Sequence, residues 1–103
     1  MSQIDILCVG DIVTDIFIKL LDQEAKIEQR GDEKWLAMPF GTKLPFDHSE
    51  TLHAVGNAAN AAVSCARLGL KVAFDTNVGG DDAGRDMVKA LGKEGVDHRF
   101  VHV

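Results

Sequence analysis

Two asparagines are spaced so that they could bind a polar small molecule together. Asn57 and Asn60 lie three residues apart in the stretch GNAANAAVSCARLG, which runs from Gly56 to Gly69. Residues three apart on a helix are neighbours, and the first turn of a helix also presents backbone N–H groups that have no partner within it. The two amides therefore offer donors and acceptors to an uncharged, hydroxylated ligand. The alternative is that Asn57 only caps the helix and Asn60 faces solvent.

A carboxylate near the N-terminus is the second candidate for ligand binding. Asp15 lies between Thr14 and Ile16, shortly after an apolar run that is typical of a strand. Ligands of open α/β sheets bind beyond the carboxyl ends of the strands. An ionised carboxylate accepts two hydroxyl hydrogens at once, in charge-assisted bonds that are about twice as strong as neutral ones, so Asp15 could hold a diol. The alternative is a loop carboxylate without a ligand.

The residues around these candidates predict alternating strands and helices. The pattern predicts a strand at 4–9, buried on both faces and closed by Gly10, and extended chain at 12–18. It then predicts a helix at 57–68 ended by Gly69, a strand at 72–78, a helix capped by Asp81 or Asp82 and stopped by Gly95, and a strand at 96–103. This order is typical of a parallel sheet with right-handed crossovers.

The helix that carries the asparagines is built almost entirely from small side chains. Alanine and serine leave a thin layer, so this helix can lie unusually close to its sheet. Gly56, just before the helix, leaves room for a backbone or ligand where a β-carbon would collide.

Between the first strand and this helix the chain makes an excursion. Residues 22–34 are nearly all polar and indicate solvated surface, with Gly31-Asp32 as a turn. Residues 35–40 and 44–46 indicate two short extended pieces around a turn. Because Pro39 and Pro45 cannot donate a ladder hydrogen bond, we expect both pieces at a sheet edge or outside the main sheet, as a flap.

Composition excludes several other classes of protein. The chain has 103 residues, the size of one globular domain, and its net charge of −5 comes without a basic cluster. Binding to nucleic acid or to an anionic membrane is therefore disfavoured. The first residues do not resemble a secretory leader and no apolar stretch approaches a membrane span, so we expect neither targeting to the secretory pathway nor a membrane anchor. Cys8 and Cys65 lie in apolar surroundings and predict two buried free thiols, as in a reducing cytoplasm.

No motif predicts a catalytic or metal-binding residue within this sequence. The stretch Gly79-Gly80-Asp81-Asp82 places carboxylates where a phosphate would need positive charge, so it indicates a turn and a helix cap. The phosphate-loop and dinucleotide-binding motifs are missing. His98 and His102 fall in a predicted strand without further ligands and indicate surface histidines.

Several of these features recur together in one family. Asp15, the helix start Gly56-Asn57-Ala58-Ala59-Asn60, the Arg67-Leu68-Gly69 end and the segment 78–84 resemble, in this order, the N-terminal part of PfkB (ribokinase-like) carbohydrate kinases. The resemblance covers essentially the whole chain and is loosest across 20–54. It implies an α/β ribokinase-like three-layer sandwich with a small β lid. Residues 1–103 would form the first β-α-β-α-β unit, with the lid at about 17–54.

The resemblance also implies a function. Family members transfer the γ-phosphoryl group of ATP, with Mg²⁺, to a hydroxymethyl group of a sugar or nucleoside. Asp15 and Asn60 match the residues that hold sugar hydroxyls, and Gly56 and Asn57 match neighbouring contact positions. The lid often forms a dimer contact, so a cytoplasmic homodimer is expected. Val13 replaces a second polar contact of ribokinases, which disfavours ribose itself, and Val55 replaces the first of two glycines.

The family's ATP site and catalytic aspartate lie in a motif that this sequence does not contain. We therefore expect the chain to be the acceptor-substrate half of a kinase and inactive alone. Two alternatives stay open, a non-catalytic sugar-binding or dimerisation module of the same fold, and a structural α/β domain that binds no hydroxylated ligand.

Overall fold

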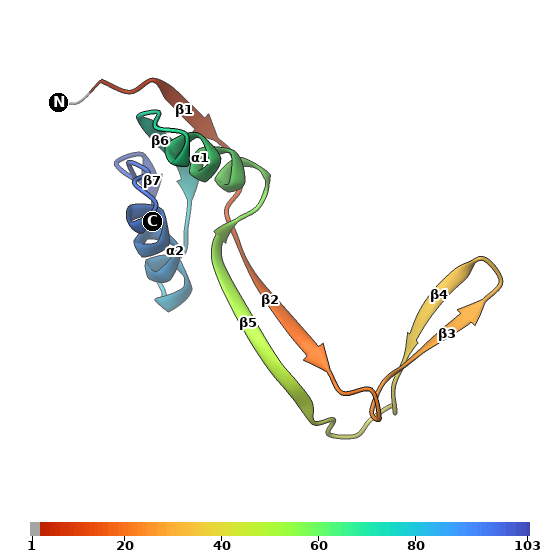
Figure 1. Cartoon of the computed structure of the whole chain (residues 1–103). Coiled ribbons are helices and arrows are strands. Elements are labelled where there is room, and N and C mark those ends of the chain that lie inside the picture. The colour runs from red at the N-terminus through yellow and green to blue at the C-terminus, as the bar shows by residue number, and fades with distance from the viewer. Residues whose placement is uncertain (1–2) are drawn as a thin grey trace. The chain divides into compact units, whose positions relative to one another are not determined.

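The computed structural model describes residues 3–103, which divide into two compact units (Figure 1). Unit 1 comprises the chain up to Asp15 together with Thr51–Val103, and unit 2 comprises Ile16–Glu50. Unit 2 overlaps the excursion that the sequence places at about 17–54. The two candidate segments of the sequence, around Asp15 and around Asn57, both lie in unit 1.

Unit 1 contains a parallel sheet of three strands. β1 (Ile6–Val9), β6 (Val72–Asn77) and β7 (Val101–His102) follow one another in the order β1-β6-β7. The helices α1 (Asn57–Arg67) and α2 (Asp82–Lys93) form the crossovers. The register pairs Ile6 with Val72 and Val9 with Asp75. The predicted α/β class and the β-α-β-α-β alternation are confirmed.

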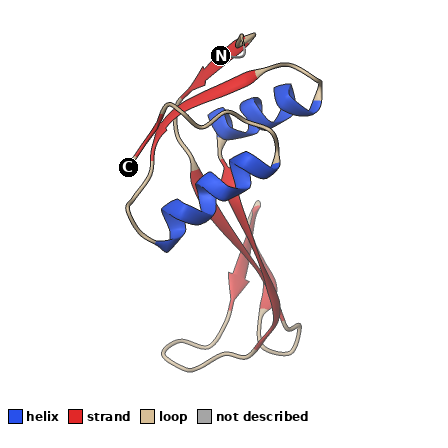
Figure 2. Ribbon diagram, turned by 90° about the vertical axis from the view of Figure 1, so that its left-hand side faces the viewer, coloured by secondary structure: helices blue, strands red, loops and turns tan. Residues whose placement is uncertain are grey.

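The core lies between this sheet and the two helices, which Figure 2 shows on the same side of the sheet. Phe74 of β6 and Leu91 of α2 are completely buried. Side chains alternate along a strand, so Val72 points to the same face as Phe74. The buried members of the core are Ala54, Ala59, Ala62, Val72, Phe74, Leu91 and Val96.

The strand β1 is more exposed than the sequence predicts. Ile6, Leu7 and Val9 are 38%, 48% and 67% exposed. Among residues 3–103, β1 pairs only with β6, and α1 and α2 cover one face of the sheet. One face of this apolar run is therefore only partly covered, although its composition is typical of a strand buried on both faces.

The small-residue helix does lie very close to the end of β1. A β-carbon added at Gly10 would be 2.7 Å from the Cβ of Ala58, nearer than such atoms approach in folded proteins. The N-cap of α1 is Gly56, at φ 104°, and no side chain caps the helix. Asn57 is the first helical residue, so its interpretation as the cap is wrong.

The start of α2 is as the sequence predicts, a turn followed by a cap. The Oδ1 of Asp81 accepts a hydrogen bond of 2.9 Å from the backbone N–H of Gly84. Gly84 is buried, and a β-carbon there would lie 1.9 Å from the carbonyl oxygen of Gly79. Only glycine fits this position.

The last strand is much shorter than the predicted strand at 96–103. Its pairing is limited to Val101–His102 and to an isolated bridge between Ala73 and Asp97. The carboxylate of Asp97 accepts hydrogen bonds from the backbone and the side chain of Arg99. These local bonds form a turn that interrupts the strand.

Unit 2 is built from extended chain. β2 (Val13–Leu20) pairs with β5 (Phe46–Val55), and both strands begin or end in unit 1. β3 (Lys26–Arg30) and β4 (Glu33–Ala37) form an antiparallel hairpin around the predicted turn at Gly31. The predicted solvated surface at 22–34 is thus largely a hairpin. The predicted piece at 35–40 overlaps the end of β4 as far as Ala37, and of the piece at 44–46 only Phe46 lies in a strand, at the start of β5.

Candidate functional site

Asp15 lies on β2, at the boundary of unit 1, and its side chain is exposed. Within residues 3–103 its carboxylate accepts no side-chain or backbone hydrogen bond and forms no ion pair. The charge is therefore left to solvent. An exposed carboxylate of this kind keeps all its acceptor sites available.

The start of α1 lies against the connection that leads into β2. A β-carbon added at Gly56 would lie 3.4 Å from the Cγ2 of Val13 and 3.7 Å from the carbonyl oxygen of Asp11. The positive φ of Gly56 is one that glycine adopts without strain. The turn that carries the candidate amides thus contacts the chain two residues before Asp15.

The side chains of both asparagines are accessible to a ligand. Asn57 and Asn60 are both exposed, and the backbone N–H of Asn60 donates to the carbonyl oxygen of Gly56 over 2.8 Å. This bond belongs to the helix and leaves the side-chain amide of Asn60 unpaired within the described residues.

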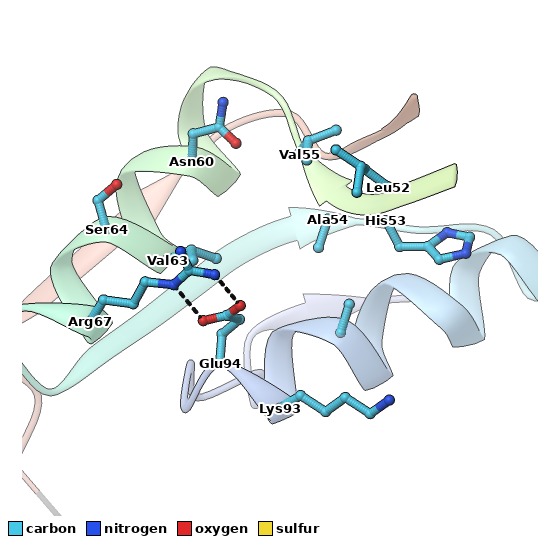
Figure 3. Close-up of a pocket in the computed structure, with 11 residues that line it drawn as sticks. Leu52, His53, Ala54, Val55, Asn60, Val63, Ser64, Arg67, Lys93 and Glu94 are labelled. Carbon is cyan, nitrogen blue, oxygen red and sulfur yellow. Dashed lines mark hydrogen bonds and ion pairs between the residues drawn. The ribbon is translucent and has the colours of Figure 1, made fainter. Parts of the chain in front are cut away.

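A cavity of about 590 Å³ lies beside Asn60, within unit 1 (Figure 3). Its volume is within the range of small-molecule sites. Of the four predicted site residues only Asn60 lines it. Asp15, Gly56 and Asn57 are outside the lining. The residues around it come from the end of β5, one face of α1 and the end of α2: Leu52, His53, Ala54, Val55, Asn60, Val63, Ser64, Arg67, Ala90, Lys93 and Glu94.

A bidentate ion pair joins the two helices across this cavity. Arg67 of α1 donates from Nε and Nη2 to the carboxylate oxygens of Glu94, over 2.8 and 2.5 Å. The guanidinium holds the pKa of Glu94 below its usual range, and the carboxylate raises the pKa of Arg67. Figure 3 shows Lys93 extending away from this pair. Arg67 and Glu94 therefore satisfy each other.

A histidine at the other end of the cavity contacts two further elements. The Nδ1 atom of His53, on β5, lies 3.2 Å from the hydroxyl oxygen of Thr14 on β2. The Nε2 atom lies 3.8 Å from a carboxylate oxygen of Asp86 on α2. Three elements of unit 1 thus meet at one imidazole ring.

Sequence patterns reveal some of these residues but not others. Ser64 and Arg67 follow Asn60 by four and seven positions, so the helical period places all three on one face. His53 and Asp86 lie on different elements, and no local spacing indicates that they meet.

Within residues 3–103 no group of three or more His, Cys, Asp or Glu side chains could hold a metal. Asp81 and Asp82 put negative charge at the start of α2.

The two thiols, Cys8 and Cys65, are free and only partly buried, which is less burial than the sequence predicts. Burial and the nearby Cys65 raise the pKa of the Cys8 thiol. Among residues 3–103 no helix is long and apolar enough to cross a membrane.

Two known proteins resemble the chain in sequence or fold. A ribokinase of Haemophilus influenzae (strain ATCC 51907 / DSM 11121 / KW20 / Rd) is 50% identical over 47 residues, which are 46% of this chain and 15% of that protein. The crystal structure of a provisionally assigned ribokinase from Agrobacterium tumefaciens matches with a TM-score of 0.61 at 24% identity, over 94% of this chain and 27% of that one. The chain thus spans about a quarter of the solved relative.

The family itself follows from a match along nearly the whole sequence. The sequence model of the pfkB family carbohydrate kinases matches residues 5–103 of this chain. This range includes both candidate segments and the α2 cap, and the fold agrees with that of the solved relative. The chain belongs to the pfkB family of carbohydrate kinases.

Proposed function

We propose that this chain provides the acceptor-binding part of an ATP-dependent sugar or nucleoside kinase. Membership in a family of carbohydrate kinases supports this class of substrate. The observation that carries the more specific proposal is the contact of Gly56 with Val13 and Asp11. This close approach supports a shared site for the exposed amides of the helix turn and the segment that carries Asp15.

Each proposed site residue has its own role. The carboxylate of Asp15 accepts hydrogen bonds from two hydroxyl groups of the acceptor. The amide of Asn60 binds a further hydroxyl beside the cavity, and Asn57 supplies a second amide on the first turn. Gly56, which has no side chain, allows the start of α1 to lie close to Val13 and Asp11, beside the proposed acceptor site.

Phosphoryl transfer itself needs groups that the described residues do not supply. It requires donors for the nucleotide phosphates, usually a metal ion, and a group that receives the hydroxyl proton. We propose that ATP and Mg²⁺ serve the complete protein and bind outside this stretch, and that the 103-residue chain is inactive alone. ATP-dependent phosphorylation of any sugar by the purified chain would contradict this. Its free thiols suit a cytoplasmic protein.

Calorimetric titration of the chain with sugars, sugar acids and nucleosides tests the acceptor site. The variants are Asp15→Asn and Asn60→Ala. Each should weaken acceptor binding by about 1–3 kcal/mol, because each removes a partner of a bound hydroxyl group. The matched control is Glu50→Gln, which neutralises another exposed strand carboxylate that has no ion pair among the described residues.

The outcome separates acceptor binding from a purely structural role. Binding that falls in both site variants and not in the control supports the proposal. If no hydroxylated compound binds, or if Asp15→Asn and Asn60→Ala both bind as the original chain does, the acceptor site is not here.

The exposed apolar side chains of unit 2 favour a second role, dimerisation. Phe17 and Ile18 on β2 are each 55% exposed, and Ile27 on the hairpin is 76% exposed. Exposed apolar patches on a folded protein mark sites of interaction with other proteins. We propose a homodimer through unit 2. Sedimentation velocity should show a dimer that Ile27→Lys weakens. A monomer at all concentrations would rule this out.

A further inference from the structure

The ring of His53 has a polar partner at each nitrogen, from two different elements. Nδ1 lies 3.2 Å from the hydroxyl oxygen of Thr14, and Nε2 lies 3.8 Å from the Asp86 carboxylate. The first distance is a hydrogen bond. The second is too long for a direct one, but it suits an ion pair or a bridging water. His53 thus links β2 to α2.

One proton arrangement satisfies all three groups. With the ring proton on Nε2, this nitrogen donates toward Asp86, and Nδ1 accepts the hydroxyl hydrogen of Thr14. The hydrogen bond to Thr14 restricts the rotation of the ring, and the Asp86 carboxylate at 3.8 Å favours the same orientation. The same hydrogen bond also restricts the rotamer of Thr14.

His53 and Thr14 both lie close to the boundary between the two units. The boundary between the units crosses β2 after Asp15 and crosses β5 before Thr51. Thr14 and His53 therefore lie in the parts of β2 and β5 that belong to unit 1, here called the roots of the two strands. The next residue, Ala54, has a φ of 58°, which is unfavourable for a non-glycine residue and needs support from its surroundings.

The contact of His53 with Asp86 lies at the surface of unit 1. The side chain of His53 is 31% exposed, and that of Asp86 is 54% exposed, so their contact is partly solvated. The specific feature is the pair of polar contacts. Of the two, the bond to Thr14 is directly relevant to function because Thr14 precedes Asp15.

We propose that His53 is a positioning residue that clamps Thr14 and thereby orders the segment that carries Asp15. The importance of that segment for an acceptor rests on the proposed function. The clamp itself does not rest on the proposed function, because it consists of contacts within unit 1. Asp86 acts on the far side of the ring and keeps it turned toward Thr14.

Substitutions at His53 can remove the two contacts separately. Asparagine carries a polar atom near the position of Nδ1 and retains the contact with Thr14, whereas glutamine reaches the position of Nε2 and retains the contact with Asp86. Leucine retains neither. Thr14→Val removes the hydroxyl group at nearly constant shape. The control is His48→Leu, the same change on the same strand, at a histidine whose one ion pair among residues 3–103 is with the neighbouring Asp47.

Amide hydrogen exchange of the purified chain measures the order of residues 13–15 without any ligand. We expect His53→Leu and Thr14→Val to speed exchange there by roughly fivefold or more, the effect of losing one hydrogen bond. His53→Asn should restore protection, and His53→Gln should restore it less. Urea unfolding of each variant identifies any general loss of stability, which would speed exchange in β6 as well.

The two proposals fail in different ways. Unchanged exchange at 13–15 in His53→Leu, or equal effects of the asparagine and glutamine variants, overturns the clamp. Faster exchange at 13–15 with β6 unchanged, together with rescue by asparagine, supports it even if no sugar binds. Failure of the original chain to bind any hydroxylated compound counts only against the acceptor site.

Discussion

Substituting Gly10 by alanine tests the close approach of α1 to the end of β1. The new β-carbon would lie 2.7 Å from the Cβ of Ala58, and the φ of Gly10 is 154°. Overpacking of this kind costs about 1–3 kcal/mol. An unfavourable backbone conformation adds about 1–3 kcal/mol. Loss of conformational freedom in the unfolded chain offsets about 0.4–1 kcal/mol of this total. We therefore expect the free energy of unfolding to fall by about 1–5.5 kcal/mol.

Urea unfolding followed by circular dichroism measures this change. A domain of this size has a free energy of unfolding of about 5–15 kcal/mol, so the variant should keep its fold but lose a large part of its stability. With a slope of about 2 kcal/mol per molar urea, the midpoint should fall by about 0.5–3 M.

Two controls separate the steric cost from the backbone cost. Gly69→Ala introduces a β-carbon at another positive φ, 94°, where no atom lies within 4 Å, so it carries only the backbone cost. Adding Ala58→Gly to Gly10→Ala removes the collision and should recover part of the loss. If Gly10→Ala is no more harmful than Gly69→Ala, the close contact does not exist and the role assigned to the small side chains of α1 is wrong.

Three further predictions concern the core, the α2 cap and the ion pair. Phe74→Ala should destabilise the chain by about 3–5 kcal/mol in the same urea assay, because Phe74 is completely buried; a loss below about 1 kcal/mol would mean that this core does not form. Gly84→Ala should cost at least as much as Gly10→Ala, since its β-carbon would meet the backbone of Gly79 at 1.9 Å, and loss of α2 signals in NMR spectra would show where the damage lies. The lowered pKa of Glu94 makes the pair with Arg67 stabilising above the ordinary glutamate pKa of about 4.3 and lost as pH falls through the lower value of the folded state. Glu94→Gln should therefore flatten the acid side of the stability profile, and an unchanged profile would count against the pair.

The order of strands and helices in unit 1 is readable from the sequence because its signals are local. Apolar runs ended by glycine predict strands, and Asp81 before an amphipathic stretch predicts a capped helix. Both Gly69 and Gly95 do have positive φ angles. Each of these features depends on a few neighbouring residues, so the pattern alone contains the information.

The parts that the sequence does not predict depend on distant partners. Every residue of β3 is exposed, so this strand shows no alternation of apolar and polar residues and looks like solvated surface. The short β7 results from a side chain, Asp97, that bonds locally to Arg99. The contact of His53 with Asp86 joins residues 33 positions apart, and no local pattern encodes it.

The candidate site is predicted to a similar extent. The helical spacing of Asn57 and Asn60 is correct, but only Asn60 lines the cavity. The role of Asn57 depends on where the helix begins. Gly56 takes the cap position with a positive φ, which leaves both amides free for other partners. That choice is a property of the backbone and is not visible in the side-chain pattern.

The parallel pairing of β1 with β6 has a kinetic consequence. Ile6 and Val72 must meet across the whole of unit 2, which occupies Ile16–Glu50. Replacing that insertion by a short linker between the roots of β2 and β5 would roughly halve the intervening chain, and each halving lowers the entropic cost of closing a flexible loop by about 0.6 kcal/mol. Unit 2, which separates β1 from β6 in the sequence, therefore slows the pairing of these two strands. A shortened chain should refold faster and form the same three-stranded sheet.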